Sequence, residues 1–166
     1  MLLGLSLPNF TLLHVAISLL GILSGLVVLA GMMQGKRLGG WTAIFLTTTI
    51  LTSATGFLFP AMKLLPSHIT GIISLVVLAI ALIARYGFLL SGAWRWIYVV
   101  TAVVALYLNV FVGVIQSFQK ISFLQPLAPT QSEPPFLVAQ LAVLALFVVF
   151  GWMSVRKFRP VASPFA

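Results

Sequence analysis

The chain contains no cysteine, and Glu133 is its only acidic residue. Without cysteine there can be no disulfide, thiolate nucleophile, iron–sulfur cluster or cysteine-ligated zinc. A single carboxylate excludes catalysis by paired acids, and it argues against carboxylate proton relays and against an oxygen-rich site for divalent cations. Zincin, P-loop, dinucleotide-binding and Ser-His-Asp patterns are also missing, so no motif indicates a reaction.

Hydrophobic residues make up 61% of the sequence and charged residues only 6%. The apolar runs are about 20 residues long, which matches the thickness of a bilayer core. They are continuous rather than alternating, which excludes a β-barrel and favours helices. No stretch is polar enough for a soluble domain, so we expect one membrane domain over residues 1–166. The predicted fold is an all-α bundle of five transmembrane helices, over residues 10–33, 41–59, 68–86, 94–118 and 136–158.

The first apolar run is too long for a signal peptide and has no basic residue before it, so we expect it to remain as the first span. Connectors are expected at 34–40, 60–67, 87–93 and 119–135. The last is the longest and ends in the pair Pro134-Pro135, which suits the first turn of a helix. The spacing Gly21-x-x-x-Gly25 is typical of close helix packing in membranes.

The basic residues are distributed unequally between the two ends of these helices. One end collects Lys36, Arg37, Arg85, Arg95, Arg156, Lys157 and Arg159. The other end has only Lys63 and Lys120. The positive-inside rule therefore predicts a cytoplasmic C-terminus and an N-terminus outside. The four tryptophans, Trp41, Trp94, Trp96 and Trp152, fall near the basic end, as in an interfacial aromatic belt.

Polar side chains from four predicted helices fall about one helical turn from the opposite, outer end. These side chains are His14, Thr55, Gln116 and Gln140. His68, Lys120 and Glu133 lie nearer the surface, and Asn109 lies deeper, near mid-membrane. We therefore expect a polar pocket in the outer leaflet, covered by the connector 119–135.

The two histidines suggest the chemistry of this pocket. Histidine is costly in lipid, and neutral imidazole is a common ligand of transition metals and haem. If the first and third spans pack together, His14 and His68 approach each other as metal or cofactor ligands. Gln116 and Gln140 would orient them, Thr55 and Asn109 would line the pocket, and Lys120 would meet haem propionates. Haem b, a transition metal and a quinone-like headgroup are the candidate ligands.

Two other interpretations remain open. The same polar residues would serve as packing contacts in a non-catalytic accessory or scaffold subunit of a larger membrane complex. A small channel or transporter is a third interpretation, with Asn109 and the threonines as its lining. Few polar residues continue such a path toward the basic loops. The expected partners are the lipid bilayer and other membrane subunits, and nucleic acid is not expected.

Three stretches resemble small, uncharacterised multi-spanning proteins of bacterial inner membranes. They are Thr52-Ser53-Ala54-Thr55-Gly56-Phe57, Leu65-Pro66-Ser67-His68, and Leu127-Ala128-Pro129-Thr130-Gln131-Ser132-Glu133-Pro134-Pro135-Phe136. The resemblance covers nearly the whole chain. It implies a location in the bacterial inner (plasma) membrane and brings no assigned activity with it.

Overall fold

The computed structural model describes residues 4–60 and 66–159, and its regular structure there is helical. The elements in chain order are α1 (Leu7–Met33), α2 (Gly39–Gly56), α3 (Pro66–Leu82), the π-helical turn η1 (Ile83–Gly87), α4 (Trp94–Lys120), the 3₁₀ turn η2 (Gln125–Leu127) and α5 (Pro134–Lys157). The all-α prediction is confirmed for these residues, and the five predicted ranges agree with the helices to within three residues when α3 and η1 are taken together. Most of the connector 60–67, including Lys63, lies outside the described residues.

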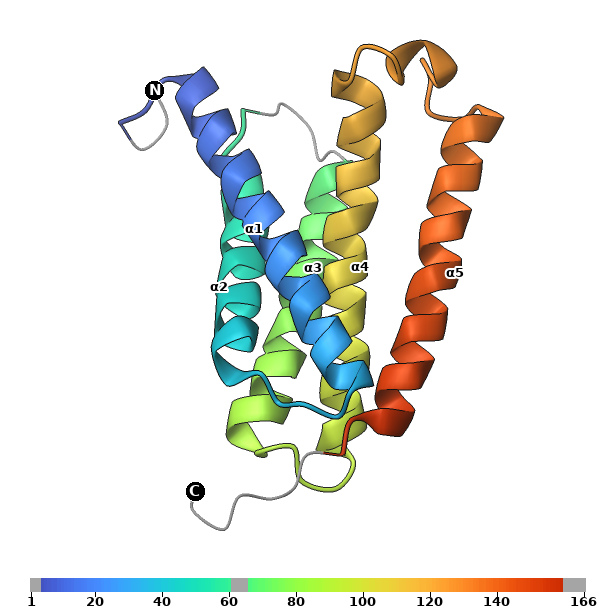
Figure 1. Cartoon of the computed structure of the whole chain (residues 1–166). Helices are drawn as coiled ribbons and strands as arrows, with labels where there is room; N and C mark the ends of the chain where they lie inside the picture. The colour runs from blue at the N-terminus through green and yellow to red at the C-terminus, as the bar shows by residue number, and fades with distance from the viewer. Residues whose placement is uncertain (1–3, 61–65, 160–166) are drawn as a thin grey trace.

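The helices form a bundle in which α1 crosses the others at a slant (Figure 1). The beginnings of α1, α3 and α5 lie at one end of the bundle with the ends of α2 and α4. Helix α2 packs on α1, α3 and α4, whereas α5 packs only on α4 and α1. The order along the chain therefore places His14, Thr55, Gln116 and Gln140 toward the same end, which we call the histidine end. The opposite end, with the basic residues, is the basic end.

Four helices of the described chain are long and apolar enough to cross a membrane: α1, the continuous helix Ser67–Gly87, α4 and α5. The fifth predicted span, α2, is not among them. It has 18 residues, or about 27 Å at the usual helical rise. Six of these residues are threonine, which lowers its hydropathy. The structure therefore supports a membrane protein with four clear candidate spans and a more polar fifth helix packed against three of them.

Local sequence accounts for several helix boundaries. The Ser6 hydroxyl accepts the backbone N–H of Asn9 at 3.5 Å and so caps α1. Helix α5 begins at the proline pair, as expected, because proline needs no hydrogen-bond partner in a first turn. Its other end is closed by Arg95, whose Nη1 donates to the carbonyls of Val155 (3.0 Å) and Phe158 (2.6 Å).

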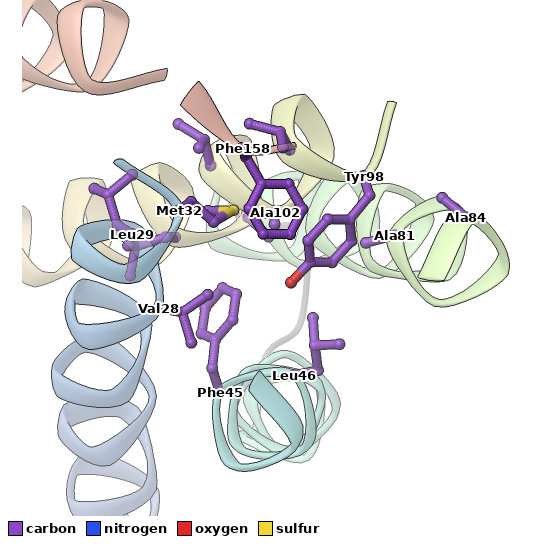
Figure 2. Packing of buried hydrophobic residues seen from close by; sticks show 14 of the residues in the cluster. Val28, Leu29, Met32, Phe45, Leu46, Ala81, Ala84, Tyr98, Ala102 and Phe158 are labelled. Carbon is purple, nitrogen blue, oxygen red and sulfur yellow. The ribbon is translucent and has the colours of Figure 1, made fainter. Parts of the chain in front are cut away.

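The main hydrophobic core lies nearer the basic end (Figure 2). There the Tyr98 ring packs beside Phe158, with ring centroids 6.0 Å apart, and its hydroxyl points toward α2. Val28, Phe45 and Leu46 complete the core between α1 and α2. These buried apolar side chains join the C-terminal half of α1 to the N-terminal halves of α2 and α4.

Gly25 lets α1 approach its neighbours closely. A Cβ built at this position would overlap Leu106 Cδ1 of α4 and would lie 2.8 Å from Phe45 Cδ2 of α2. Both neighbours are buried, so neither has free space to move into. The expected packing role of the Gly21-x-x-x-Gly25 spacing is confirmed at Gly25.

The connector after α4 runs between the outer ends of α4 and α5 (Figure 1). Phe118, Ala128 and Phe136 form a second, small apolar cluster that holds it there, with the two phenyl rings edge to face at 5.5 Å. Residues 119–135, expected to cover a pocket shared by four helices, thus lie at the ends of the two helices that carry Gln116 and Gln140. The physical reason is that the apolar side chains of this connector pack where α4 and α5 are joined.

Glu133 orders the last part of the connector. Its carboxylate accepts the Thr130 hydroxyl at 2.7 Å and the backbone N–H groups of Thr130 (3.0 Å) and Ser132 (3.1 Å). Desolvation by the surrounding chain acts to raise the pKa of this carboxyl. The hydrogen bonds from Thr130 and Ser132 outweigh it, so the pKa of Glu133 lies below its usual value.

We expect Gly25→Ala to destabilise the protein by about 1–3 kcal/mol, because its added methyl overpacks a filled core. Thermal or denaturant unfolding of the detergent-solubilised protein would measure this. Gly113→Ala is the matched control, since a Cβ there meets only Ile22 Cδ1 at an ordinary 3.5 Å. Equal stability of the two variants would contradict the close packing at Gly25.

We expect protection of the Thr130 and Ser132 amides to depend on the ionised Glu133 carboxylate. The folded pKa is lowered, so the stabilisation is present above the unfolded pKa and is lost as the pH falls through the folded pKa. Amide hydrogen exchange, corrected for intrinsic rates, would show this loss in acid. In Glu133→Gln the protection should be weak at neutral pH already. Unchanged protection in that variant would rule out the role of the carboxylate.

Candidate functional site

The strongest polar contact at the histidine end joins His14 of α1 to Thr55 of α2, with His14 Nδ1 and Thr55 Oγ1 2.7 Å apart. The Thr55 hydroxyl also donates to the backbone carbonyl of Leu51, four residues earlier, at 2.7 Å. A hydroxyl has one hydrogen, and this one is used within α2. We therefore assign His14 Nδ1 as the donor to Thr55, which in the neutral ring leaves the acceptor lone pair on Nε2.

Phenyl rings flank this imidazole. The Phe59 ring meets His14 edge to face, with centroids 5.2 Å apart, and Phe10 lies 5.1 Å from Phe59. His14 is half-buried, so it is neither sealed in the core nor fully exposed. The result is an imidazole with a fixed orientation and an aromatic wall beside it.

His68 of α3 has a different neighbour. Its ring stacks on Phe57, with centroids 5.6 Å apart and planes 13° from parallel. Thr55, Phe57 and Phe59 all belong to the end of α2 and the turn after it. Helix α2 packs on both α1 and α3, so each histidine is held by its own contact with this segment. The expected approach of the two histidines would require direct packing of the first span (α1) on the third (α3). In the structure both helices pack on α2.

Gln140 and Gln116 do not orient the histidines. The Gln140 side chain is buried, and its Nε2 donates to the Phe111 carbonyl of α4 at 3.2 Å. Gln116 is exposed, as is Lys120. On α4, Asn109 and Gly113 lie against α1. Gln116 and Lys120, nearer the histidine end of the same helix, do not. The prediction that these four helices share one pocket is therefore wrong for Gln116 and Gln140.

Asn109 belongs to a separate polar cluster in the middle of the bundle. The Cβ position of Gly21 lies 3.1 Å from Asn109 Nδ2, 3.2 Å from Thr48 Oγ1 and 3.3 Å from Thr49 Oγ1. Polar groups of α2 and α4 thus meet at a glycine of α1. Asn109 Nδ2 and Thr49 Oγ1 are buried and have no hydrogen-bond partner within residues 4–60 and 66–159.

Sequence reasoning missed two kinds of contact. The Ser53 and Ser74 hydroxyl oxygens lie 3.1 Å apart and so join α2 to α3, and no spacing within one helix predicts such a pair. Nothing in the sequence distinguishes Phe10 and Phe59 from the many other apolar residues, so their packing beside His14 could not be predicted. A hollow on the exposed side of α1 also went unforeseen; it is apolar and is lined by Leu7, Pro8, Thr11, Leu12 and Val15.

The described residues contain no group of three or more histidine, cysteine, aspartate or glutamate side chains able to hold a metal ion. Comparisons with protein-family models, with curated proteins and with solved structures found no match for the chain. The site must therefore be interpreted from its own geometry.

We expect His14 and Thr55 to be energetically coupled. In a double-mutant cycle with His14→Ala and Thr55→Val, the coupling should be about 0.6–1.7 kcal/mol, the range for hydrogen bonds between membrane helices. Unfolding in mixed micelles is a suitable measurement. Thr101→Val is the control, because the Thr101 hydroxyl donates to Ile97 and Tyr98 carbonyls of its own helix. Coupling as large with Thr101 would contradict a specific pair.

Proposed function

We propose that this protein is a multi-spanning membrane protein that binds a small lipophilic ligand at its histidine end through His14. The ligand class that fits best is a ring-shaped headgroup bearing a hydroxyl, such as a quinol. The observation that supports this most directly is the orientation of His14, which directs Nδ1 to Thr55 and leaves Nε2 as a hydrogen-bond acceptor.

The chemistry of the neighbours supports the same class of ligand. A quinol hydroxyl donates a hydrogen bond, which Nε2 can accept, and its ring can pack against the phenyl groups of Phe59 and Phe10. Haem held by two histidines is supported less, because it requires His14 and His68 on one iron, and the His68 ring stacks on Phe57 instead. In this proposal His68 and Phe57 belong to the wall of the site rather than to its ligands.

The proposal includes an orientation and a location. The basic residues at one end favour that end in the cytoplasm of a bacterial inner membrane. The histidine end and the N-terminus then face outward. Helix α2 would span the bilayer as the fifth helix, because Thr42, Thr48 and Thr49 are buried against its neighbours and so would not face lipid.

A second candidate function is that of a non-catalytic scaffold subunit in a larger membrane complex. The observation that favours it is that several buried or half-buried polar contacts join neighbouring helices. Ser53–Ser74 joins α2 to α3, and Gln140–Phe111 joins α4 to α5. Interhelical contacts of this kind hold a bundle together whether or not it binds a ligand.

A direct binding measurement separates the two candidates. We expect purified protein to bind a short-chain quinol, and we expect His14→Ala to weaken that binding about tenfold, the loss of one good hydrogen bond. Gln116→Ala is the matched control and should leave binding unchanged, since Gln116 is exposed. An absorption spectrum of the same preparation would reveal haem.

Two results would count against ligand binding at His14. One is quinol affinity that is the same for His14→Ala and the unaltered protein. The other is a stoichiometric protein partner that co-purifies while no quinol binds, which would favour the scaffold subunit instead.

A further inference from the structure

The basic residues at the basic end have no acidic side chain among them. Arg85 lies in the π-helical turn η1, and only 8% of its surface is exposed. The only acidic side chain, that of Glu133, lies just before α5 at the opposite end of the bundle. A buried charge normally needs a partner, because its removal from water costs several kcal/mol.

The guanidinium of Arg85 is only partly satisfied by the protein. Its Nη1 is buried and has no hydrogen-bond partner in the described chain. Its Nη2 donates to the Arg37 carbonyl over a long 3.4 Å. The ring faces of Tyr86 and Tyr98, with centroids 5.6 Å and 5.3 Å from Arg85 Cζ, stabilise the charge but do not neutralise it.

The same guanidinium lies at the beginning of α2. Its Nη2 is 3.9 Å from the Cβ position of Gly39, the first residue of that helix. No side chain caps this end of α2, so its first N–H groups and the positive end of the helix dipole are available. A Cβ at Gly40 would meet nothing within 4 Å, so there is open space beside these N–H groups.

We propose that Arg85 and the uncapped first turn of α2 together bind a phosphate group, and that this phosphate belongs to an anionic phospholipid. A phosphate suits both parts, since helix N-termini bind anions through backbone N–H groups and arginine binds phosphate oxygens. The exposed side chains of Lys36 and Arg37, which directly precede α2, add to the attraction.

The position of the site favours a lipid over a soluble anion. It lies where the apolar helices end, at the level of the headgroups of a bilayer. Trp41 and Tyr86, both about half exposed, flank it as interfacial aromatic residues do. Ile44 and Ile83, one turn or less further into the apolar part, offer exposed surface for an acyl chain.

The test compares lipid binding by the full-length protein in neutral detergent. Phosphatidylglycerol and phosphatidylcholine are titrated separately, and bound lipid is counted by native mass spectrometry. We expect phosphatidylglycerol to bind preferentially, and Arg85→Gln to reduce its affinity about five- to tenfold. Arg156→Gln removes the same charge from an exposed residue that rests on Trp152, and it should change the affinity less than twofold.

A second pair of variants tests the helix end without touching Arg85. Gly40→Asp places a carboxylate at the first turn of α2, where it also favours the helix dipole. We expect it to keep the fold and to abolish the preference for phosphatidylglycerol, whereas the neutral Gly40→Asn should retain the preference. These variants remain decisive if Arg85→Gln does not fold.

Three outcomes would overturn the proposal. Equal losses in Arg85→Gln and Arg156→Gln would indicate general attraction to the basic end. Equal lipid binding by Gly40→Asp and Gly40→Asn would exclude the helix end as part of the site. Displacement of the lipid by inorganic phosphate at a concentration equal to that of the lipid would indicate that the site binds a soluble anion.

Discussion

The bundle depends on a polar helix, α2, that satisfies several of its own hydroxyl groups. In α2, Thr48 donates to Ile44, Ser53 to Thr49 and Thr55 to Leu51, each across one turn. A hydroxyl bonded in this way imposes almost no polarity on the neighbouring helix. Helix α2 can therefore pack on α1, α3 and α4 although its composition is too polar for a typical membrane span.

The same backbone bonds determine the chemistry at the histidine end. Because the Thr55 hydrogen is directed to Leu51, the Thr55 oxygen remains as an acceptor, and His14 must donate to it. A helix-internal hydrogen bond thus fixes the tautomer of a side chain on a neighbouring helix. This link explains why the neutral His14 ring has a defined acceptor atom, Nε2.

Much of the fold could be predicted from the sequence, since long apolar runs bounded by proline, glycine and basic residues define helices directly. The one-end distribution of His14, Thr55 and Gln140 also followed from counting along each helix. Their position in a common pocket could not be predicted in this way, because the depth of a residue along a helix does not determine which side of the helix it faces. Gln116 and Gln140 lie at similar depth, yet one is exposed and the other faces α4.

Contacts between helices were the other limit. The insertion of α2 between α1 and α3 depends on the close approach at Gly25 and on pairs such as Ser53 with Ser74, which only the packed bundle reveals. Arg85 illustrates the same limit. The sequence places it among seven basic residues at one end, and nothing in its neighbours along the chain distinguishes a buried guanidinium from a solvated one.

The unequal charge at the two ends has a consequence for biogenesis. Under the orientation set by the positive-inside rule, the insertion machinery would carry across the bilayer only connectors with Lys63, Lys120 and Glu133, whose formal charges sum to one. Seven cations would stay behind and resist export against the resting potential, at about 2.3 kcal/mol per charge for each 100 mV. In that orientation the charge pattern would oppose inverted insertion during synthesis, before any of the tertiary contacts has formed.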